Sequence, residues 1–515
     1  EKHPSSAFCR AGSFRIMDSW RRLQEAAPIG FELFQVTWPS VVSGVVAQAT
    51  GLTTLFFVSS FDDPYLLGSV GLGSMAQNVF GFSLGLGLNS ALDTLISQSH
   101  GAGEHELSGL FLWQAQVLSL SICVPCIAAL MFSEQFFLLL GIDSRTAHDA
   151  GLYVQGTLPA MPLLFLYSAT RLFLRASKIT RPDFYVSVAT MLLHPLWCAL
   201  FLRVLPWGAF GAGLTASASN ALRFLLLSAY AAAARPGAGG RQWRCLPWPC
   251  EALRAPGARR AVAQRAGGFR AYLAVAIPSA LLMWSEWWVY EVMSLLAGLC
   301  GTMSLAAHTA ACNLLLIMFM VPVALGGATG ALVGNALGEG NPAQARAVIF
   351  IAGKFVASLF VILAVLVWLL RYPLSRLFNT HASFVGLFAQ ICHIMAPFIV
   401  VDSVQTVLEG ALRGLGLQRQ ASQVKLVSMV GVRLVGAYVL ALPCGLGVLG
   451  IWTAGLAGMV VTLAFYWRIM RSANFEAISA SVRQRLHSQS HSALTSLDQA
   501  VGDGRELVKS NGAGS

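Results

Sequence analysis

The sequence predicts an all-α membrane protein whose twelve transmembrane helices form two pseudo-symmetric six-helix bundles. Of its 515 residues, 56% are hydrophobic and only 11% are charged, whereas soluble domains carry about 25% charged residues. Apolar runs of about 20 residues, long enough to span a bilayer, recur along most of the chain. The two halves of the chain also resemble each other. Because this composition leaves no room for a soluble catalytic domain, we expect that the protein is not an enzyme.

Twelve apolar segments are candidate spans. Their centres lie near Gly44, Phe82, Ile122, Leu164, Leu193, Leu222, Trp288, Phe319, Leu363, Val400, Leu434 and Gly458. The predicted regions are a cytoplasmic N-terminal segment at 1–29, an N-lobe with six spans at 30–233, a basic cytoplasmic linker at 234–269, a C-lobe with six spans at 270–471 and a cytoplasmic tail at 472–515. The tail is polar, so we expect most of it to be disordered. The sequence lacks an initial methionine and a cleavable signal pattern, so we expect a truncated start.

Basic residues are concentrated in alternate loops of this topology. Eight arginines lie between Arg235 and Arg270, with Glu251 as the only acid among them. The other loops after even-numbered spans hold Arg175, Lys178, Arg181, Arg346, Arg419 and Lys425, whereas the loops after odd-numbered spans hold Asp62, Asp63, Glu134 and Asp143. This asymmetry follows the positive-inside bias and predicts that both termini are cytoplasmic. It also explains the basic patches better than nucleic-acid binding does, so we expect no nucleic-acid partner.

Short motifs of the first half recur in the second half at a nearly constant interval. Pro39–Ser40 recurs 239 positions later as Pro278–Ser279, and Leu95–Gly103 recurs in part 237 positions later as Leu332–Gly340. Six spans per repeat is an even number, so both repeats enter the membrane from the same side and are parallel. Two such bundles around a central cavity predict an alternating-access carrier, because a channel usually needs more subunits or repeats around its pore.

Motifs for bound cofactors are absent or incomplete. No Gly-x-x-x-x-Gly-Lys-Ser/Thr run is present, so we expect transport to draw on an ion gradient and not on ATP. Cys123-Val-Pro-Cys126 has metal-ligand spacing, but no second pair or histidine cluster accompanies it. We therefore expect these cysteines to be buried small residues, with no metal site.

The seventh span carries two acids in an apolar setting, within the run Glu286-Trp-Trp-Val-Tyr-Glu291. Ionisable groups at this depth are costly and usually mark an ion, proton or substrate pathway. Glu286 and Tyr290 share one helical face, whereas Glu291 stacks under Trp287 on another. Aromatic faces attract cations, so we expect a carboxylate that exchanges a proton for a cation. The alternative is a structural carboxyl group that is hydrogen-bonded to a neighbouring helix.

The tenth span offers a polar stripe in an apolar helix. Asp402, Gln405 and Glu409 lie at positions i, i+3 and i+7, a spacing that places them on one face. The cost of desolvation directs such a face toward the interior of the bundle. We expect Asp402 to take part in proton or cation coupling and Gln405 to line the cavity, while Glu409 pairs locally with Arg413.

Other polar residues within spans are weaker candidates. Asn313 in the eighth span is a candidate for the cavity wall. His194 in the fifth span is a candidate proton relay, although a helix–helix contact explains it better. Asp93 fits packing or capping, and Gln48 and Asn78 fit interhelical hydrogen bonds.

Four motifs resemble the multidrug and toxin extrusion (MATE) family. They are Ser90–Gly103, Glu286–Glu291, Val333–Asn341 and Leu408–Gln418. The Glu-Trp-Trp-x-Tyr-Glu run is similar to the eukaryotic branch. The resemblance implies two lobes that form a V, and efflux of organic cations in exchange for protons, with Glu286 and Asp402 central to substrate and proton binding.

The sequence departs from the family pattern in three respects, one of which is that we expect no counterpart of the thirteenth span found in some animal members. Asn313 stands where animal members often carry a glutamate, and the first span lacks the aspartate that bacterial members often use. The first span offers only Ser43, Gly44 and Gln48 there. The absence of an aspartate from the first span favours a cation site in the second lobe.

We therefore expect a monomeric, proton-coupled antiporter that exports organic cations and xenobiotics across the plasma or vacuolar membrane. Its partners would be small organic cations and the lipid bilayer, with protons in place of a cofactor. Sodium-coupled efflux is the first alternative. A flippase for lipids or lipid-linked sugars is a weaker one, because it calls for a basic cavity. A receptor or scaffold without transport activity is the third.

Overall fold

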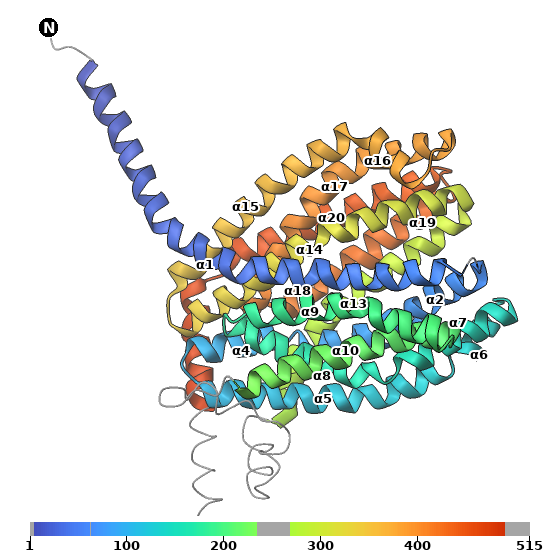
Figure 1. Ribbon diagram of the computed structural model, residues 1–515. Coiled ribbons are helices and arrows are strands. Elements are labelled where there is room, and N and C mark those ends of the chain that lie inside the picture. The colour runs from blue at the N-terminus through green and yellow to red at the C-terminus, as the bar shows by residue number, and fades with distance from the viewer. Residues whose placement is uncertain (1–4, 62, 234–267, 490–515) are drawn as a thin grey trace, which may run out of the picture.

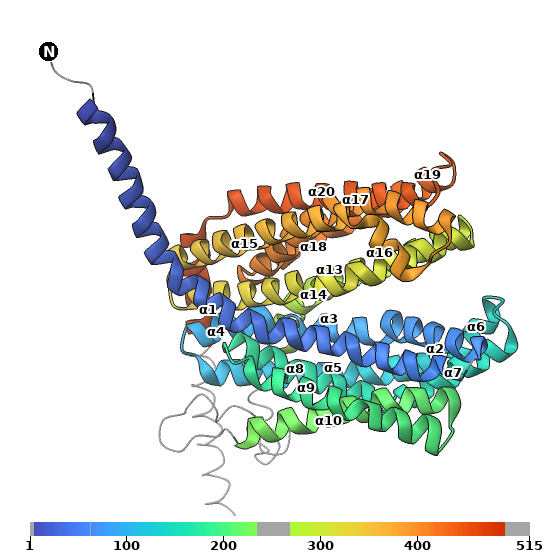
Figure 2. The ribbon, with the colours of Figure 1, turned by 45° about the horizontal axis from the view of Figure 1, so that its top comes forward.

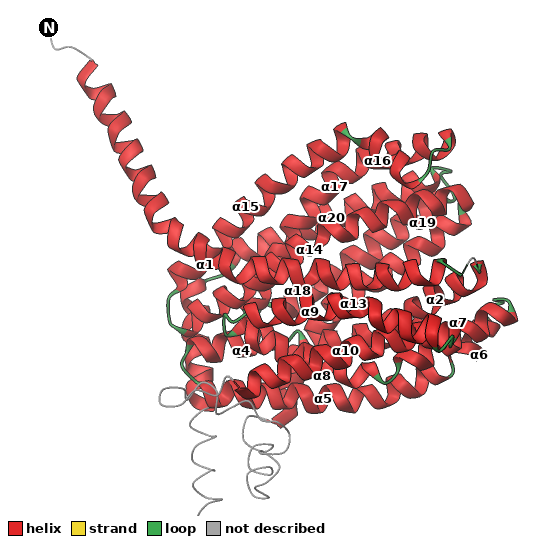
Figure 3. Cartoon of the chain, viewed as in Figure 1, coloured by secondary structure: helices red, strands yellow, loops and turns green. Residues whose placement is uncertain are grey.

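The computed structural model describes residues 5–61, 63–233 and 268–489. Within these ranges the chain is almost entirely helical, and no strand occurs in them (Figure 3). The predicted all-α fold class is therefore confirmed. Two features named above lie outside the described residues: most of the basic linker, at 234–267, and the tail beyond residue 489.

The helices follow the predicted order of spans. Those of the first half are α1 (Ser5–Ser59), α2 (Pro64–Gln77), the π-helical η1 (Asn78–Phe82), α3 (Ser83–Asn89), α4 (Leu92–Gly101), α5 (His105–Met131), α6 (Ser133–Leu139), α7 (Ser144–Thr157), α8 (Ala160–Ala176), α9 (Arg181–Cys198), the π-helical η2 (Ala199–Val204) and α10 (Gly208–Ala233). Those of the second half are α13 (Gly268–Leu299), α14 (Thr302–Gly338), α15 (Pro342–Leu369), α16 (Arg371–Phe378), α17 (Ala382–Gly414), α18 (Gln418–Leu426), the π-helical η4 (Val427–Leu434), α19 (Val435–Ala441) and α20 (Gly447–Ser472). Each of the twelve predicted centres falls in a separate helix or unbroken helical run.

Length and apolarity identify most of these helices as membrane spans. Nine helices of the described residues qualify, and a tenth does if α7 and α8, bent by 49° to each other, count as one span. The remaining two predicted centres, Leu222 and Trp288, lie in α10 and α13. The chain is thus a multi-pass membrane protein.

Local sequence explains where several helices begin. The Asp63 side chain accepts a hydrogen bond from the backbone N–H of Tyr65 at 3.0 Å, and Pro64 occupies the first helical position of α2. Asn341 caps α15 in the same way, accepting from the backbone N–H of Gln344 at 3.1 Å. Such caps satisfy helix N–H groups that have no partner within the helix.

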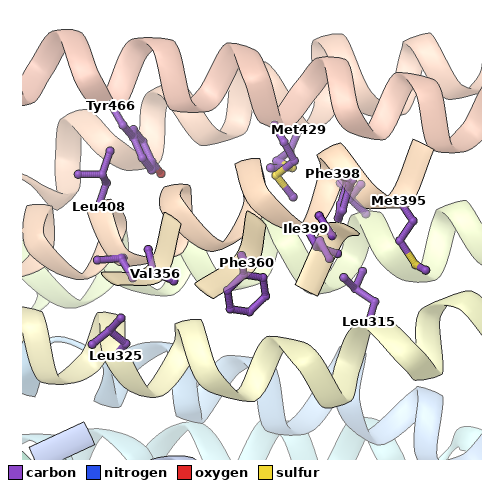
Figure 4. Close-up of a cluster of buried hydrophobic side chains, with 14 of the residues drawn as sticks. Leu315, Leu325, Val356, Phe360, Met395, Phe398, Ile399, Leu408, Met429 and Tyr466 are labelled. Atoms are coloured by element: carbon purple, nitrogen blue, oxygen red, sulfur yellow. The ribbon is translucent and has the colours of Figure 1, made fainter. Parts of the chain in front are cut away.

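The two halves of the chain form two layers (Figures 1 and 2). The largest group of buried apolar side chains lies mainly in the C-lobe, where it joins α14, α15, α17 and α20, as Figure 4 shows for Phe360, Phe398 and Tyr466. The first half has smaller clusters, one of which holds Cys123 and Cys126. The predicted burial of these two cysteines is confirmed.

The lobes meet where the repeated motif Leu95–Gly103 in α4 packs against its counterpart in α14. A Cβ atom on Gly101 would strike the backbone of Asn335, and one on Gly338 would strike the backbone of Gln98. These are equivalent contacts, because 98 + 237 = 335 and 101 + 237 = 338. Glycine therefore permits a close backbone approach around a pseudo-two-fold axis.

Side-chain amides repeat the same symmetry at this contact. The Gln98 Nε2 atom donates to the carbonyl oxygen of Gly414 at 2.9 Å, and the Asn335 Nδ2 atom donates to that of Ala176 at 2.8 Å. Each amide reaches from its own lobe to the opposite one. The two repeats are thus locked together at this end by matching hydrogen bonds.

The tail differs from the expectation of disorder, because residues 475–489 form a helix that connects the lobes (red in Figure 1). Phe475 packs into the C-lobe core, whereas Val482 and Leu486 are buried with residues of α4, α5 and α8. The Arg485 Nη2 atom donates to Gln98 Oε1 at 2.5 Å. Apolar residues at helical spacing explain this packing, although the surrounding composition is polar.

Candidate functional site

A cavity of about 410 Å³ lies between the lobes. Its N-lobe wall is formed by α1 and η1, and its C-lobe wall by α13 and α14. The polar and aromatic lining residues are Gln48, Asn78, Glu286, Trp287, Tyr290, Glu291, Ser294, Asn313 and Phe319. This volume lies within the range of small-molecule sites in proteins, about 300–1,000 Å³.

The α13 helix supplies most of the polar chemistry of the cavity. Four of the candidate residues named from the sequence, Glu286, Trp287, Tyr290 and Glu291, line it, and Asn313 joins them from α14. The two acids lie on adjacent helical faces, and the cavity is wide enough to reach both. The C-lobe wall therefore combines two carboxyl groups with aromatic rings.

The N-lobe wall contributes neutral amides. Gln48 comes from α1, and Asn78 is the first residue of the π-helical turn η1. The sequence predicted interhelical hydrogen bonds for these residues, but the structure places both on the cavity wall. Wider π turns change the direction of side chains and often occur at functional sites.

A buried lysine connects two acids behind the cavity. The Lys425 Nζ atom donates to Glu286 Oε2 at 2.8 Å and to Glu409 Oε2 at 2.6 Å. The prediction that Lys425 lies in a cytoplasmic loop is wrong, because its side chain is only 1% exposed, on α18 inside the C-lobe. The predicted pairing of Glu409 with Arg413 is likewise replaced by this ion pair with Lys425.

The polar stripe of α17 faces the interior of the C-lobe, as the desolvation argument predicted. Asp402, Gln405 and Glu409 are all buried, and Asp402 and Gln405 do not line the cavity. Asp402 lies within electrostatic range of Glu286 and of Arg433. The Arg433 guanidinium also covers the ring of Tyr290, at 4.3 Å from its centroid.

His194 and Asp93 lie away from the cavity. His194 makes hydrogen bonds inside the N-lobe, to Thr54 Oγ1 at 2.9 Å and to Ser219 Oγ at 2.8 Å. This is the helix–helix contact, so His194 is not among the cavity residues. Asp93 does not cap a helix; it forms a buried ion pair with Arg175 Nη2 at 2.7 Å.

Sequence reasoning missed Lys425 and Arg433 as parts of the C-lobe site. Lys425 was assigned to a loop because the start of a span is uncertain by several residues. The missed signal is its place in the apolar run Val424-Lys-Leu-Val427, across a short turn from the acidic stripe of α17. Arg433 stands within the eleventh predicted span, where any charge is costly.

Comparison with known proteins places this architecture among transporters of similar sequence. The family model described as MatE matches residues 39–200 and 278–439, so it covers both repeats at an interval of 278 − 39 = 239 residues. Multidrug and toxin extrusion protein 1 from Rattus norvegicus is 31% identical over 401 residues, 75% of this chain and 65% of that protein. The Homo sapiens protein of the same name is 31% identical over 407 residues, 78% of this chain and 66% of that protein.

The match therefore spans just under two thirds of the length of these relatives. Among solved structures, the eukaryotic MATE transporter AtDTX14 has a TM-score of 0.81 and 21% sequence identity. The similarity covers 90% of this chain and 99% of that one. At this identity the likeness concerns the fold, and it agrees with the arrangement of two six-helix lobes.

Proposed function

The chain belongs to the MatE family, and from this premise we propose that it is a proton-coupled antiporter that exports organic cations. The observation that carries the proposal is the cavity of about 410 Å³ with Glu286 and Glu291 on one wall. Anionic carboxyl groups attract a cation, and Trp287 and Tyr290 offer aromatic faces for its organic part. Among the described residues that line the cavity, none is Lys, Arg or His.

The exchange of a proton for an organic cation follows because both compete for the same carboxyl groups. A proton that enters from the more acidic side neutralises Glu286 and weakens its hold on a cation. When the proton leaves on the other side, the restored anion binds the next cation. Asp402 is buried within electrostatic range of Glu286, so its charge state influences the same exchange.

Alternating access would come from a change in the contact between the lobes. They touch at the end formed by α4, α14 and residues 475–489. They also touch between α13 and α3, where the Trp284 Nε1 atom donates to Ser83 Oγ at 2.7 Å. We expect the end at α4 and α14 to be cytoplasmic, because the positive-inside bias places both termini there. Both walls of the cavity come from one chain, which supports a monomer as the functional unit. The plasma membrane and the vacuolar membrane are the proposed locations.

The test is uptake of radiolabelled tetraethylammonium by proteoliposomes whose interior is more acidic than the medium. We expect Glu286→Gln to reduce uptake at least about tenfold, because one unit of charge is lost in a poorly screened site. Asp402→Asn should reduce it less, because Asp402 is outside the cavity. The matched control is Glu134→Gln, whose carboxyl group lies away from the cavity beside His148.

Wild-type uptake by the Glu286→Gln variant, with unchanged pH dependence, would contradict the proposed site. Uptake that requires a sodium gradient at fixed pH would instead assign sodium as the coupling ion. No uptake across a panel of organic cations would favour a receptor or scaffold.

A further inference from the structure

The helix at residues 475–489 carries a short basic run that ends at an exposed serine. The run is Arg483-Gln-Arg485-Leu-His-Ser488, and it holds the only Arg-x-Arg of the whole sequence. Ser488 is exposed, and its Oγ atom donates to the backbone carbonyl oxygen of Arg485 at 2.8 Å. A serine that follows two arginines by three and five residues has a charge pattern that basophilic protein kinases select in their substrates. The proposed function of the cavity gives this run no role.

The two arginines of the run lie at the contact between the lobes. The Arg485 Nη2 atom donates to Gln98 Oε1 in the N-lobe at 2.5 Å. The Arg483 side chain lies against Gly340 of the C-lobe, where a Cβ atom would be 2.9 Å from Arg483 Nη1. A kinase that recognises both arginines can bind them only when they leave these positions. Docking of the helix on the lobes and binding of a kinase therefore exclude each other.

A phosphate group at Ser488 would compete with Gln98 for Arg485. Ser488 follows Arg485 by three residues, so the two side chains are neighbours on one face of the helix. A phosphoserine carries a charge of about −1.5 to −2 at neutral pH. It accepts paired hydrogen bonds from a guanidinium group, and these are stronger than a bond to a neutral amide. Arg485 then binds within its own helix and no longer holds that helix to the N-lobe.

We propose that Ser488 is a phosphorylation site for a basophilic protein kinase, and that its phosphate group loosens the helix at residues 475–489 from the contact between the lobes. In this reaction the Ser488 Oγ atom bonds to the γ-phosphorus of ATP, the bond from that phosphorus to the oxygen of ADP breaks, and the hydroxyl proton passes to the kinase. Access of the kinase rests on the proposed cytoplasmic position of this end of the protein. It does not depend on proton coupling or on cation binding in the cavity.

The first test is phosphorylation of the purified full chain by protein kinase B with radiolabelled ATP, with the labelled residue located by mass spectrometry. We expect the label at Ser488 and a loss of most incorporation in Ser488→Ala. Ser481→Ala is the matched control, because Ser481 is exposed on the same helix but follows no arginine by three or five residues. Gln98→Ala should raise the initial rate of labelling severalfold, because it frees Arg485 for the kinase. Absence of label at Ser488 in both the wild type and Gln98→Ala would overturn the proposal.

The second test is hydrogen–deuterium exchange of the backbone amides at residues 475–489, before and after phosphorylation. We expect severalfold faster exchange in the phosphorylated protein, because local opening of the helix becomes easier when its bond to Gln98 is lost. Kinase-treated Ser488→Ala should keep the slow exchange of the untreated wild type. Label at Ser488 with unchanged exchange would show that the phosphate does not loosen the helix. Neither test measures transport, so failure of the proposed antiport in tetraethylammonium uptake remains distinguishable from failure of this proposal.

Discussion

The two lobes arise from one repeat, yet they contribute different chemistry to the cavity. The C-lobe wall carries Glu286 and Glu291, whereas the N-lobe wall carries the amides of Gln48 and Asn78. The repeat position that corresponds to Glu286 is Ala47, since 286 − 239 = 47. In contrast, the contact between α4 and α14 keeps matching hydrogen bonds in both lobes. The repeats are thus similar where the lobes meet and different where we propose that a cation binds.

The largest expected effect is a loss of stability at Asp93, a buried acid that lies near two arginines at equivalent positions of the two repeats. Arg175 and Arg413 are 238 positions apart, and both approach Asp93, at 2.7 and 3.9 Å. We expect Arg175→Met to lower the free energy of unfolding by about 3–5 kcal/mol, because it leaves a buried carboxylate without its main partner. The more distant Arg413 should matter less. Thermal unfolding in detergent measures both variants.

The double variant Asp93→Asn with Arg175→Met is the control for this prediction. It removes the unpaired charge and should recover much of the lost stability. If Arg175→Met and Arg413→Met lower the free energy of unfolding equally, the two arginines stabilise Asp93 to the same extent, which would contradict this prediction.

A smaller effect tests the symmetry of the lobe contact itself. Gly101→Ala and Gly338→Ala each place a Cβ atom against the backbone of the opposite lobe. Overpacking of this kind costs about 1–3 kcal/mol, and the two losses should agree because the contacts are equivalent. Thermal unfolding again provides the measurement. Gly353→Ala on α15, where a Cβ atom meets nothing within 4 Å, should show no such loss.

Removal of the side-chain amides at this contact should lower the free energy of unfolding by a smaller amount still. Asn335→Ala removes one interlobe hydrogen bond, which in membrane proteins contributes about 0.6 kcal/mol on average. Gln98→Ala should cost somewhat more, because Gln98 also accepts a hydrogen bond from Arg485. A double variant of Gln98 and Arg485 therefore separates the symmetric bond from the contact with residues 475–489. A larger loss for Asn335→Ala than for Gln98→Ala would contradict this account.

The sequence alone predicted the spans, the duplication and the acids of α13, because each leaves a local pattern. Apolar length marks a span, and Glu286 and Glu291 stand out as charges within one. It did not predict the partner of Glu286, since Lys425 is 139 residues away in the sequence and was assigned to a loop. The helix at 475–489 was missed for a related reason: its apolar residues are few, and only the packed lobes provide a surface for them.

The N-lobe wall of the cavity likewise shows that a sequence pattern does not record contacts between distant helices. Gln48 and Asn78 look like ordinary polar residues within spans, for which interhelical hydrogen bonds are the usual interpretation. Their place opposite α13 depends on how two separate bundles pack against each other. No pattern within α1 or η1 records that arrangement.

The most direct test of the central claim is equilibrium binding of tetraethylammonium to the purified protein, with one wall altered at a time. We predict that the double variant Glu286→Gln with Glu291→Gln weakens binding at least about tenfold, because both carboxyl groups are lost from a poorly screened site. The matched variant of the N-lobe wall, Gln48→Leu with Asn78→Leu, should stay within about threefold of the wild type, since it removes no charge. Loss of binding in the N-lobe variant, with wild-type affinity in the C-lobe variant, would contradict the assignment of the cation site to the C-lobe.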